Sequence, residues 1–143
     1  MPKTAVDTSV LVAALLTEHD AHPRAHRGLE EVLSTEATVI LPVHALLEAY
    51  SVMTRLPSPF RLSPQNAFQI LRASFETRAK LVGFTPDFWL FLEDASSQAL
   101  AGGIIYDAQI LASAIHGGAN RILTLNQRDF ERIKPEGFEV VRL

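Results

Sequence analysis

Short apolar runs alternate along the chain with longer stretches in which apolar residues recur at helical spacing. The runs predict strands at about 4–7, 38–41, 80–84, 121–125 and 138–142. The helical spacing predicts helices at about 8–16, 23–34, 42–55, 64–77, 85–100, 104–116 and 129–133. Five strands separated by helices favour an α/β fold, with a central, mostly parallel five-stranded sheet flanked by helices.

Proline, serine and glycine mark the ends of these elements. Pro57 and Pro59 end one helix, and Ser63 is placed to cap the next, with Pro64 in its first turn. The pair Gly102-Gly103 separates two later helices. No repeat, low-complexity segment or linker interrupts the pattern, so we expect one domain over residues 1–143.

The composition excludes several classes of protein. Apolar residues make up 48% of the 143 residues and charged residues 20%, which is globular composition. The absence of cysteine excludes disulfides and thiolate metal sites, and is consistent with a cytoplasmic protein. No apolar run approaches the roughly 18–20 residues of a membrane span. The first seven residues reach a charge at once and contain no signal-peptide hydrophobic region.

The net charge of −3 does not favour binding to nucleic acid, but the charge is unevenly distributed. Residues 49–80 hold five basic side chains against the single acid Glu76, namely Arg55, Arg61, Arg72, Arg78 and Lys80. We expect this basic stretch to flank an acidic pocket, where it could hold a phosphate backbone. The alternative is that it forms the solvated surface of two helices.

Two acidic residues lie at the end of a predicted strand or shortly after one. Asp7 ends the first strand, and Asp129 closely follows the fourth. In parallel sheets, ligands bind beyond the carboxyl ends of the strands, at the point where the strand order reverses. Each residue also has a purely structural interpretation: Asp7 as a helix N-cap, and Asp129 as the acid of a capping box that begins at Asn126.

Two further acids lie on helices. Glu48 shares one face of a mostly apolar helix with His44, Ser51 and Arg55, and this polar stripe either lines a pocket or is the wet side of the helix. Asp107 shares a face with apolar residues, where an unpaired carboxylate is costly. Its structural interpretation is a first-turn acid stabilised by the helix dipole.

The conjunction of the four acids is more informative than any one of them. Clustered carboxylates repel one another and raise each other's pKa values unless a cation neutralises them. Oxygen ligands without cysteine suit a hard divalent cation such as Mg²⁺ or Mn²⁺.

With these residues in view, the sequence resembles the PIN-domain family and, within it, the VapC-type toxins. The resemblance covers nearly the whole chain. It is carried by four segments in order: Ala5-Val6-Asp7-Thr8-Ser9-Val10-Leu11-Val12, Leu47-Glu48-Ala49-Tyr50, Ile105-Tyr106-Asp107-Ala108-Gln109-Ile110 and Leu123-Thr124-Leu125-Asn126-Gln127-Arg128-Asp129-Phe130.

The resemblance implies a metal-binding catalytic pocket formed by Asp7, Glu48, Asp107 and Asp129. It also implies supporting roles for Thr8, Ser9, Thr124 and Asn126. Some relatives carry an acid where this chain has Asn126, and we assign the metal contact to Asp129 because of its charge. The implied protein is a metal-dependent ribonuclease toxin, with an antitoxin as partner and a homodimer as its assembly.

The reaction expected of such a site is hydrolysis of an RNA phosphodiester by metal-activated water. His44 and Arg55 are candidates for substrate binding. The apolar run 84–92, which contains Trp89, is a candidate dimer surface. One alternative is a non-catalytic PIN-like module that binds RNA or protein. Another is a small-molecule phosphatase, although no glycine-rich phosphate loop is present.

Overall fold

The computed structural model describes residues 1–83 and 86–143. Within these residues the strands are β1 (Thr4–Val6), β2 (Val39–Pro42), β3 (Ala79–Val82), β4 (Arg121–Thr124) and β5 (Glu139–Arg142). The helices are α1 (Thr8–Leu15), α2 (His22–Thr35), α3 (Val43–Arg55), α4 (Pro64–Phe75), α5 (Phe88–Ser97), α6 (Ile104–His116) and α7 (Gln127–Ile133). The predicted α/β class is confirmed.

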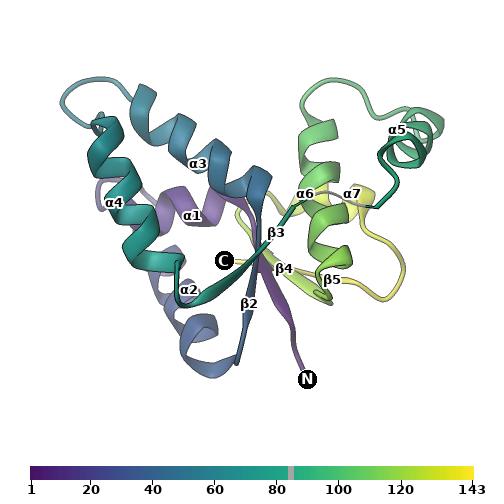
Figure 1. Ribbon diagram of the computed structural model, residues 1–143, viewed down its shortest axis with the longest axis horizontal. Coiled ribbons are helices and arrows are strands. Elements are labelled where there is room, and N and C mark those ends of the chain that lie inside the picture. The colour runs from purple at the N-terminus through teal and green to yellow at the C-terminus, as the bar shows by residue number, and fades with distance from the viewer. Residues whose placement is uncertain (84–85) are drawn as a thin grey trace.

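The strands form one parallel sheet in the order β3-β2-β1-β4-β5. Helices α1 to α4 lie on one side of the sheet and α5 to α7 on the other (Figure 1). This division follows from the right-handedness of strand–helix–strand connections, because the chain first moves outward from β1 to β3 and then continues from β4 to β5 in the opposite direction. The strand order therefore reverses between β1 and β4.

Burial on both faces explains the apolar strands. Every residue of β1 and of β2 is buried, as expected when helices cover both sides of a parallel sheet. Leu11 of α1, Ile110 of α6 and Phe130 of α7 are fully buried side chains of the core. Aligned in this way, the carboxyl ends of β1 and β4 meet at one edge of the sheet.

Most predicted boundaries are confirmed to within a few residues. Ser63 caps α4 by accepting a hydrogen bond of 3.1 Å from the backbone N–H of Asn66. The helix predicted from residue 85 instead begins at Phe88, because the Asp87 side chain caps it. Residues 84 and 85, which the predicted strand and helix included, lie outside the described residues.

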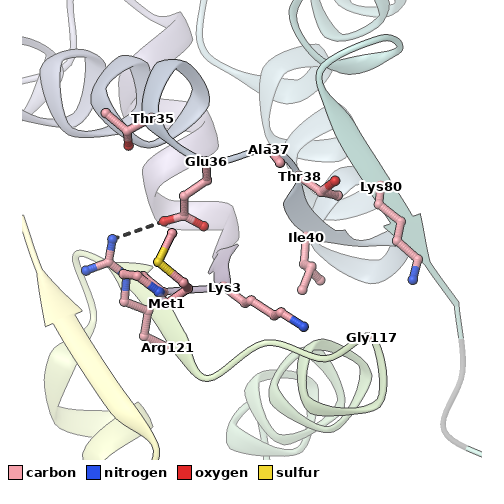
Figure 2. A pocket seen from close by; sticks show the side chains of 11 residues that line it. Met1, Lys3, Thr35, Glu36, Ala37, Thr38, Ile40, Lys80, Gly117 and Arg121 are labelled. Atoms are coloured by element: carbon pink, nitrogen blue, oxygen red, sulfur yellow. Dashed lines mark hydrogen bonds and ion pairs between the residues drawn. The ribbon is translucent and has the colours of Figure 1, made fainter.

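A partly buried ion pair lies at the opposite, amino-terminal edge of the sheet. Glu36, whose side chain is 8% exposed, lies 3.1 Å from the Arg121 guanidinium. Glu36 also accepts hydrogen bonds from the Thr4 backbone N–H at 2.8 Å and from the Thr4 hydroxyl. Figure 2 shows the Glu36 and Arg121 side chains pointing toward one another in this pocket, across from Lys3 and Lys80. The contacts join β1, β4 and the end of α2.

None of the helices within residues 1–83 and 86–143 combines the length and the apolar character needed to cross a membrane.

Candidate active site

Asp7 lies at the point where the strand order reverses. It directly follows β1 and is 3% exposed. Its side chain accepts a hydrogen bond of 2.7 Å from the backbone N–H of Thr8, so it also caps α1. The structural interpretation of Asp7 is therefore confirmed, and the capping hydrogen bond occupies only one of its two carboxylate oxygens.

Two hydroxyl groups hold that second oxygen. Ser9 Oγ donates to Asp7 Oδ2 at 2.8 Å, and Thr124 Oγ1 donates to the same oxygen at 2.9 Å. The same hydroxyls accept from the loop after β4, since the backbone N–H of Leu125 donates to Ser9 and that of Asn126 donates to Thr124. Burial raises the pKa of Asp7, and these hydrogen bonds act in the opposite direction.

Glu48 reaches the same region from α3, which begins directly after β2. His44 Nε2 lies 2.7 Å from Glu48 Oε1, one helical turn away, and the Glu48 side chain is 37% exposed. The Thr8 hydroxyl donates to the Ala45 carbonyl at 3.2 Å, which joins the start of α1 to the start of α3. Of the polar stripe on α3, Glu48 lines the acidic pocket and His44 contacts Glu48.

Asp107 lies in the first turn of α6. Burial, and to a lesser degree the negative charges of Asp7, Asp129 and Glu48, together raise the pKa of Asp107 to about 7. All four predicted acids therefore lie within electrostatic range of one another. Asp107 does lie in the first turn, as its structural interpretation requires. The helix dipole, however, does not account for the three other acids around it.

Asn126 and Asp129 form a pair. Asn126 Nδ2 donates to Asp129 Oδ2 at 2.9 Å. Asn126 is the N-cap residue of α7, yet its side chain makes no capping hydrogen bond, so the capping-box interpretation is wrong in this respect. The Asn126 amide is instead directed to the carboxylate one turn into the helix.

These groups border a pocket of about 480 Å³. Its lining residues are Asp7, Thr8, Ser9, Val12, His19, Glu48, Val52, Asp107, Leu125 and Asn126. Three of the four predicted acids line this pocket. The fourth, Asp129, accepts a hydrogen bond from Asn126, which lines it. The sequence interpretation missed His19, which lies in the loop after α1, where no periodicity signals a contact with residues far along the chain.

The donor set suits a hard cation, although the carboxylates are turned to other partners. No three His, Asp or Glu side chains in the described part of the chain are arranged as a cluster able to hold a metal ion. Asp7 is engaged by two hydroxyls, Glu48 by His44 and Asp129 by Asn126. The three carboxylates offer oxygen atoms, the ligands that Mg²⁺ and Mn²⁺ prefer.

The basic stretch 49–80 does not flank the pocket as a unit. Arg78 pairs with Glu30 at 2.8 Å, and Arg72 pairs with Glu76 on α4. Lys80, on β3, lines the pocket at the amino-terminal edge of the sheet. The expectation was wrong because a parallel strand carries its first residues to the edge opposite the acids. Arg55 lies exposed at the far end of α3.

Tyr106 adjoins the acids and was not predicted as a functional residue. The Tyr106 ring stacks on the His44 ring, with 5.4 Å between centroids and 6° between planes. Tyr106 directly precedes Asp107 in the sequence, which is the only signal that could have drawn attention to it.

Comparison with known proteins identifies the family of this chain. The PIN domain family matches residues 4–135. The ribonuclease VapC40 of Mycobacterium tuberculosis is 35% identical over 144 residues, covering 92% of this chain and 95% of that protein. The ribonuclease VapC27 of the same species is 38% identical over 122 residues, covering 80% of each chain.

Solved structures show the same fold at lower identity. A chain of the VapBC2 complex from Rickettsia felis, bound to a promoter DNA fragment, superposes with a TM-score of 0.68 at 17% identity, covering 98% of both chains. The Mycobacterium tuberculosis toxin VapC20 superposes with a TM-score of 0.64 at 19% identity, covering 84% of this chain and 87% of that one. Together with the family match and the two ribonuclease relatives, the chain belongs to the PIN domain family and, within it, to the VapC ribonucleases.

Proposed function

We propose that this protein is a metal-dependent endoribonuclease that acts in the cytoplasm as the toxin of a toxin–antitoxin pair. The observation that carries the proposal is the convergence of four carboxylates from separate elements at the edge where the strand order reverses. Burial, followed by repulsion from the other three carboxylates, raises the pKa of Asp107 to about 7. A protein that keeps such a cluster gains stability from a bound cation, and the relatives' ribonuclease activity supplies the reaction.

We assign the binding of Mg²⁺ or Mn²⁺ to Asp7, Glu48, Asp107 and Asp129. When bound, a divalent cation lowers the pKa of a coordinated water and stabilises charge on the phosphodiester oxygens. The residues of the chain position that chemistry. Ser9 and Thr124 fix the orientation of the Asp7 carboxylate, and Asn126 fixes that of Asp129. Thr8 holds α1 against α3, which carries Glu48.

The proposed partners are RNA, a cognate antitoxin and a second copy of the chain. Several structural relatives are complexes, such as the VapBC complex of Salmonella typhimurium and the FitAB complex bound to a DNA fragment. On α5, within the predicted surface 84–92, Trp89 is 83% exposed and Leu90 is 52% exposed. These apolar side chains support the proposed dimer surface.

Cleavage assays with matched substrates test the proposed activity. We expect the protein to cleave single-stranded RNA with Mg²⁺ or Mn²⁺, to be inactive in chelator, and to leave a small phosphoester such as p-nitrophenyl phosphate intact. Asp107→Asn should abolish cleavage, whereas Glu93→Gln, an exposed acid on α5, should not. RNA binding without cleavage would favour the non-catalytic module, and hydrolysis of the small phosphoester alone would favour the phosphatase.

A further inference from the structure

The stacked rings of His44 and Tyr106 join α3 to α6 beside the acidic pocket. Their planes are within 6° of parallel and their centroids are 5.4 Å apart, which is an offset stack. Tyr106 remains 55% exposed. A ring whose role was only to pack two helices together would be largely buried, so much of this ring is accessible to a ligand.

The position of this pair relates it directly to the acids. His44 Nε2 lies 2.7 Å from Glu48 Oε1, and Tyr106 is the neighbour of Asp107 in the first turn of α6. Figure 1 shows the amino-terminal ends of α3 and α6 near the same edge of the sheet. A flat group resting on the Tyr106 ring would therefore place whatever is attached to it next to the carboxylates.

We propose that the Tyr106–His44 pair is a stacking platform for one unpaired base of the RNA substrate, adjacent to the phosphate that is cleaved. This inference rests on the proposed nuclease function and deepens it. Every nucleobase has a π-face that can extend a stack begun by two protein rings, whereas a paired base presents its edge to the protein. The platform thus selects single-stranded over duplex RNA without reading its sequence.

The surrounding charge supports a nucleotide more than an apolar ligand. Beyond Glu48 on the same face of α3, the exposed guanidinium of Arg55 follows seven residues later, about 10 Å along the helix at 1.5 Å per residue. A strand with one base on Tyr106 could extend its phosphates along this face toward Arg55. The acids, with a divalent cation, would lie between the two contacts.

Binding of two ligands with equal charge tests the platform. The probes are fluorescein-labelled octaadenylate and an octamer of abasic ribose phosphate, with Ca²⁺ present and fluorescence anisotropy as the readout. We compare wild type with Tyr106→Phe, Tyr106→Leu and Tyr106→Ala. The control is Phe60→Leu, an aromatic residue that is 50% exposed on the turn after α3, outside the pocket lining. Thermal melts confirm that each variant is folded.

We expect Tyr106→Ala and Tyr106→Leu to bind octaadenylate about ten-fold more weakly than wild type, since stacking contributes on this scale per base. Tyr106→Phe and Phe60→Leu should bind as wild type does, and all variants should bind the abasic octamer equally. Unchanged octaadenylate binding by Tyr106→Ala would overturn the proposal, as would full binding by Tyr106→Leu or an equal loss on both octamers. Absence of octaadenylate binding by wild type would also count against it.

Cleavage assays on the same proteins separate this inference from the proposed function. Base-dependent binding by a wild-type protein that never cleaves RNA would refute the nuclease and leave the platform standing. Cleavage by wild type together with unaltered kinetics in Tyr106→Ala would do the opposite. If both hold, the alanine variant should raise KM about ten-fold and change kcat less, because the ring contacts the base and not the reacting phosphate.

Discussion

The hydroxyl of Thr124 donates a hydrogen bond of 2.9 Å to Asp7 Oδ2, across 117 positions of sequence. The pairing of β1 with β4 places these residues together. Val6 is aligned with Leu123, and Asp7 and Thr124 are the next residues along the two strands. A threonine at the end of one strand thus orients an aspartate at the end of its neighbour. Parallel pairing brings the two strand ends to one edge of the sheet.

Replacing this threonine by valine removes the hydroxyl at nearly constant volume. We expect Thr124→Val to lower the free energy of unfolding by about 1 kcal/mol, because the Asn126 N–H loses its acceptor. The loss should be no larger, since Asp7 Oδ2 keeps its hydrogen bond from Ser9. Affinity for Mn²⁺ should also fall. Urea unfolding and calorimetry measure the two effects. Thr35→Val, at the exposed end of α2, is the control, and equal losses in both variants would contradict a special role for Thr124.

The stability of the metal-free protein should depend on pH through Asp107. Its pKa is about 7 in the folded state, above the ordinary value of 3.8 expected for the unfolded chain. Between these values the folded protein binds more protons than the unfolded one, so the free energy of unfolding falls as pH rises from about 4 to 7. Asp107→Asn should show a smaller decrease, because Asp7, whose pKa burial also raises, still contributes to it. At pH 7.5 this variant should be at least as stable as wild type.

Thermal melts in chelator at several pH values test that expectation. Glu93→Gln, on the exposed face of α5, should keep the wild-type pH profile. A loss of more than about 2 kcal/mol in Asp107→Asn at pH 7.5 would show that Asp107 stabilises the fold. It would contradict the expectation that its buried charge, repelled by the other acids, destabilises the metal-free protein.

Mn²⁺ should bind to the wild-type protein and raise its melting temperature, because the cation neutralises the clustered carboxylates. The double variant Asp7→Asn/Asp107→Asn should lose this binding. Isothermal titration calorimetry measures the affinity directly. Equal binding by the double variant, or no binding by wild type, would refute the assignment of these acids to the metal.

Two ion pairs in this chain differ in burial and should differ in their contribution to stability. We expect Glu36→Ala to cost about 3 kcal/mol, because it leaves the Arg121 guanidinium without its buried partner and the Thr4 N–H without an acceptor. Glu30→Ala breaks the exposed pair with Arg78 and should cost less than about 1 kcal/mol. Denaturant unfolding measures both. Metal binding should be intact in each, since Glu36 lies at the opposite edge of the sheet from the acids.

Growth of a bacterial host tests the proposed toxin. Expression of wild type should slow growth, Asp7→Asn should abolish the effect, and co-expression of the adjacent small gene should relieve it. Equal harmlessness of wild type and Asp7→Asn would reject the toxin while allowing another PIN nuclease. Equal toxicity of both would show that catalysis is not the cause, and would favour the binding module.

The sequence by itself determined the α/β class and the positions of the acids. Asp7 follows β1 and Asp129 closely follows β4, so a parallel sheet is enough to bring both to one edge. Glu48 and Asp107 could be chosen because each stands out from its own helix, as part of a polar stripe or as a carboxylate beside apolar neighbours. These are local patterns, which the chain carries whether or not it is folded.

Only the tertiary structure decided which partners these side chains meet. The Asn126 amide bonds to Asp129 and leaves the helix uncapped, Tyr106 stacks on His44 from another helix, and Lys80 lies at the edge opposite the acids. Each outcome depends on the packing of segments that are distant in sequence or on the direction of a strand through the sheet. Charge and periodicity along the chain specify neither the packing of distant segments nor the direction of a strand. They describe which residues are neighbours in sequence and not which residues face one another in space.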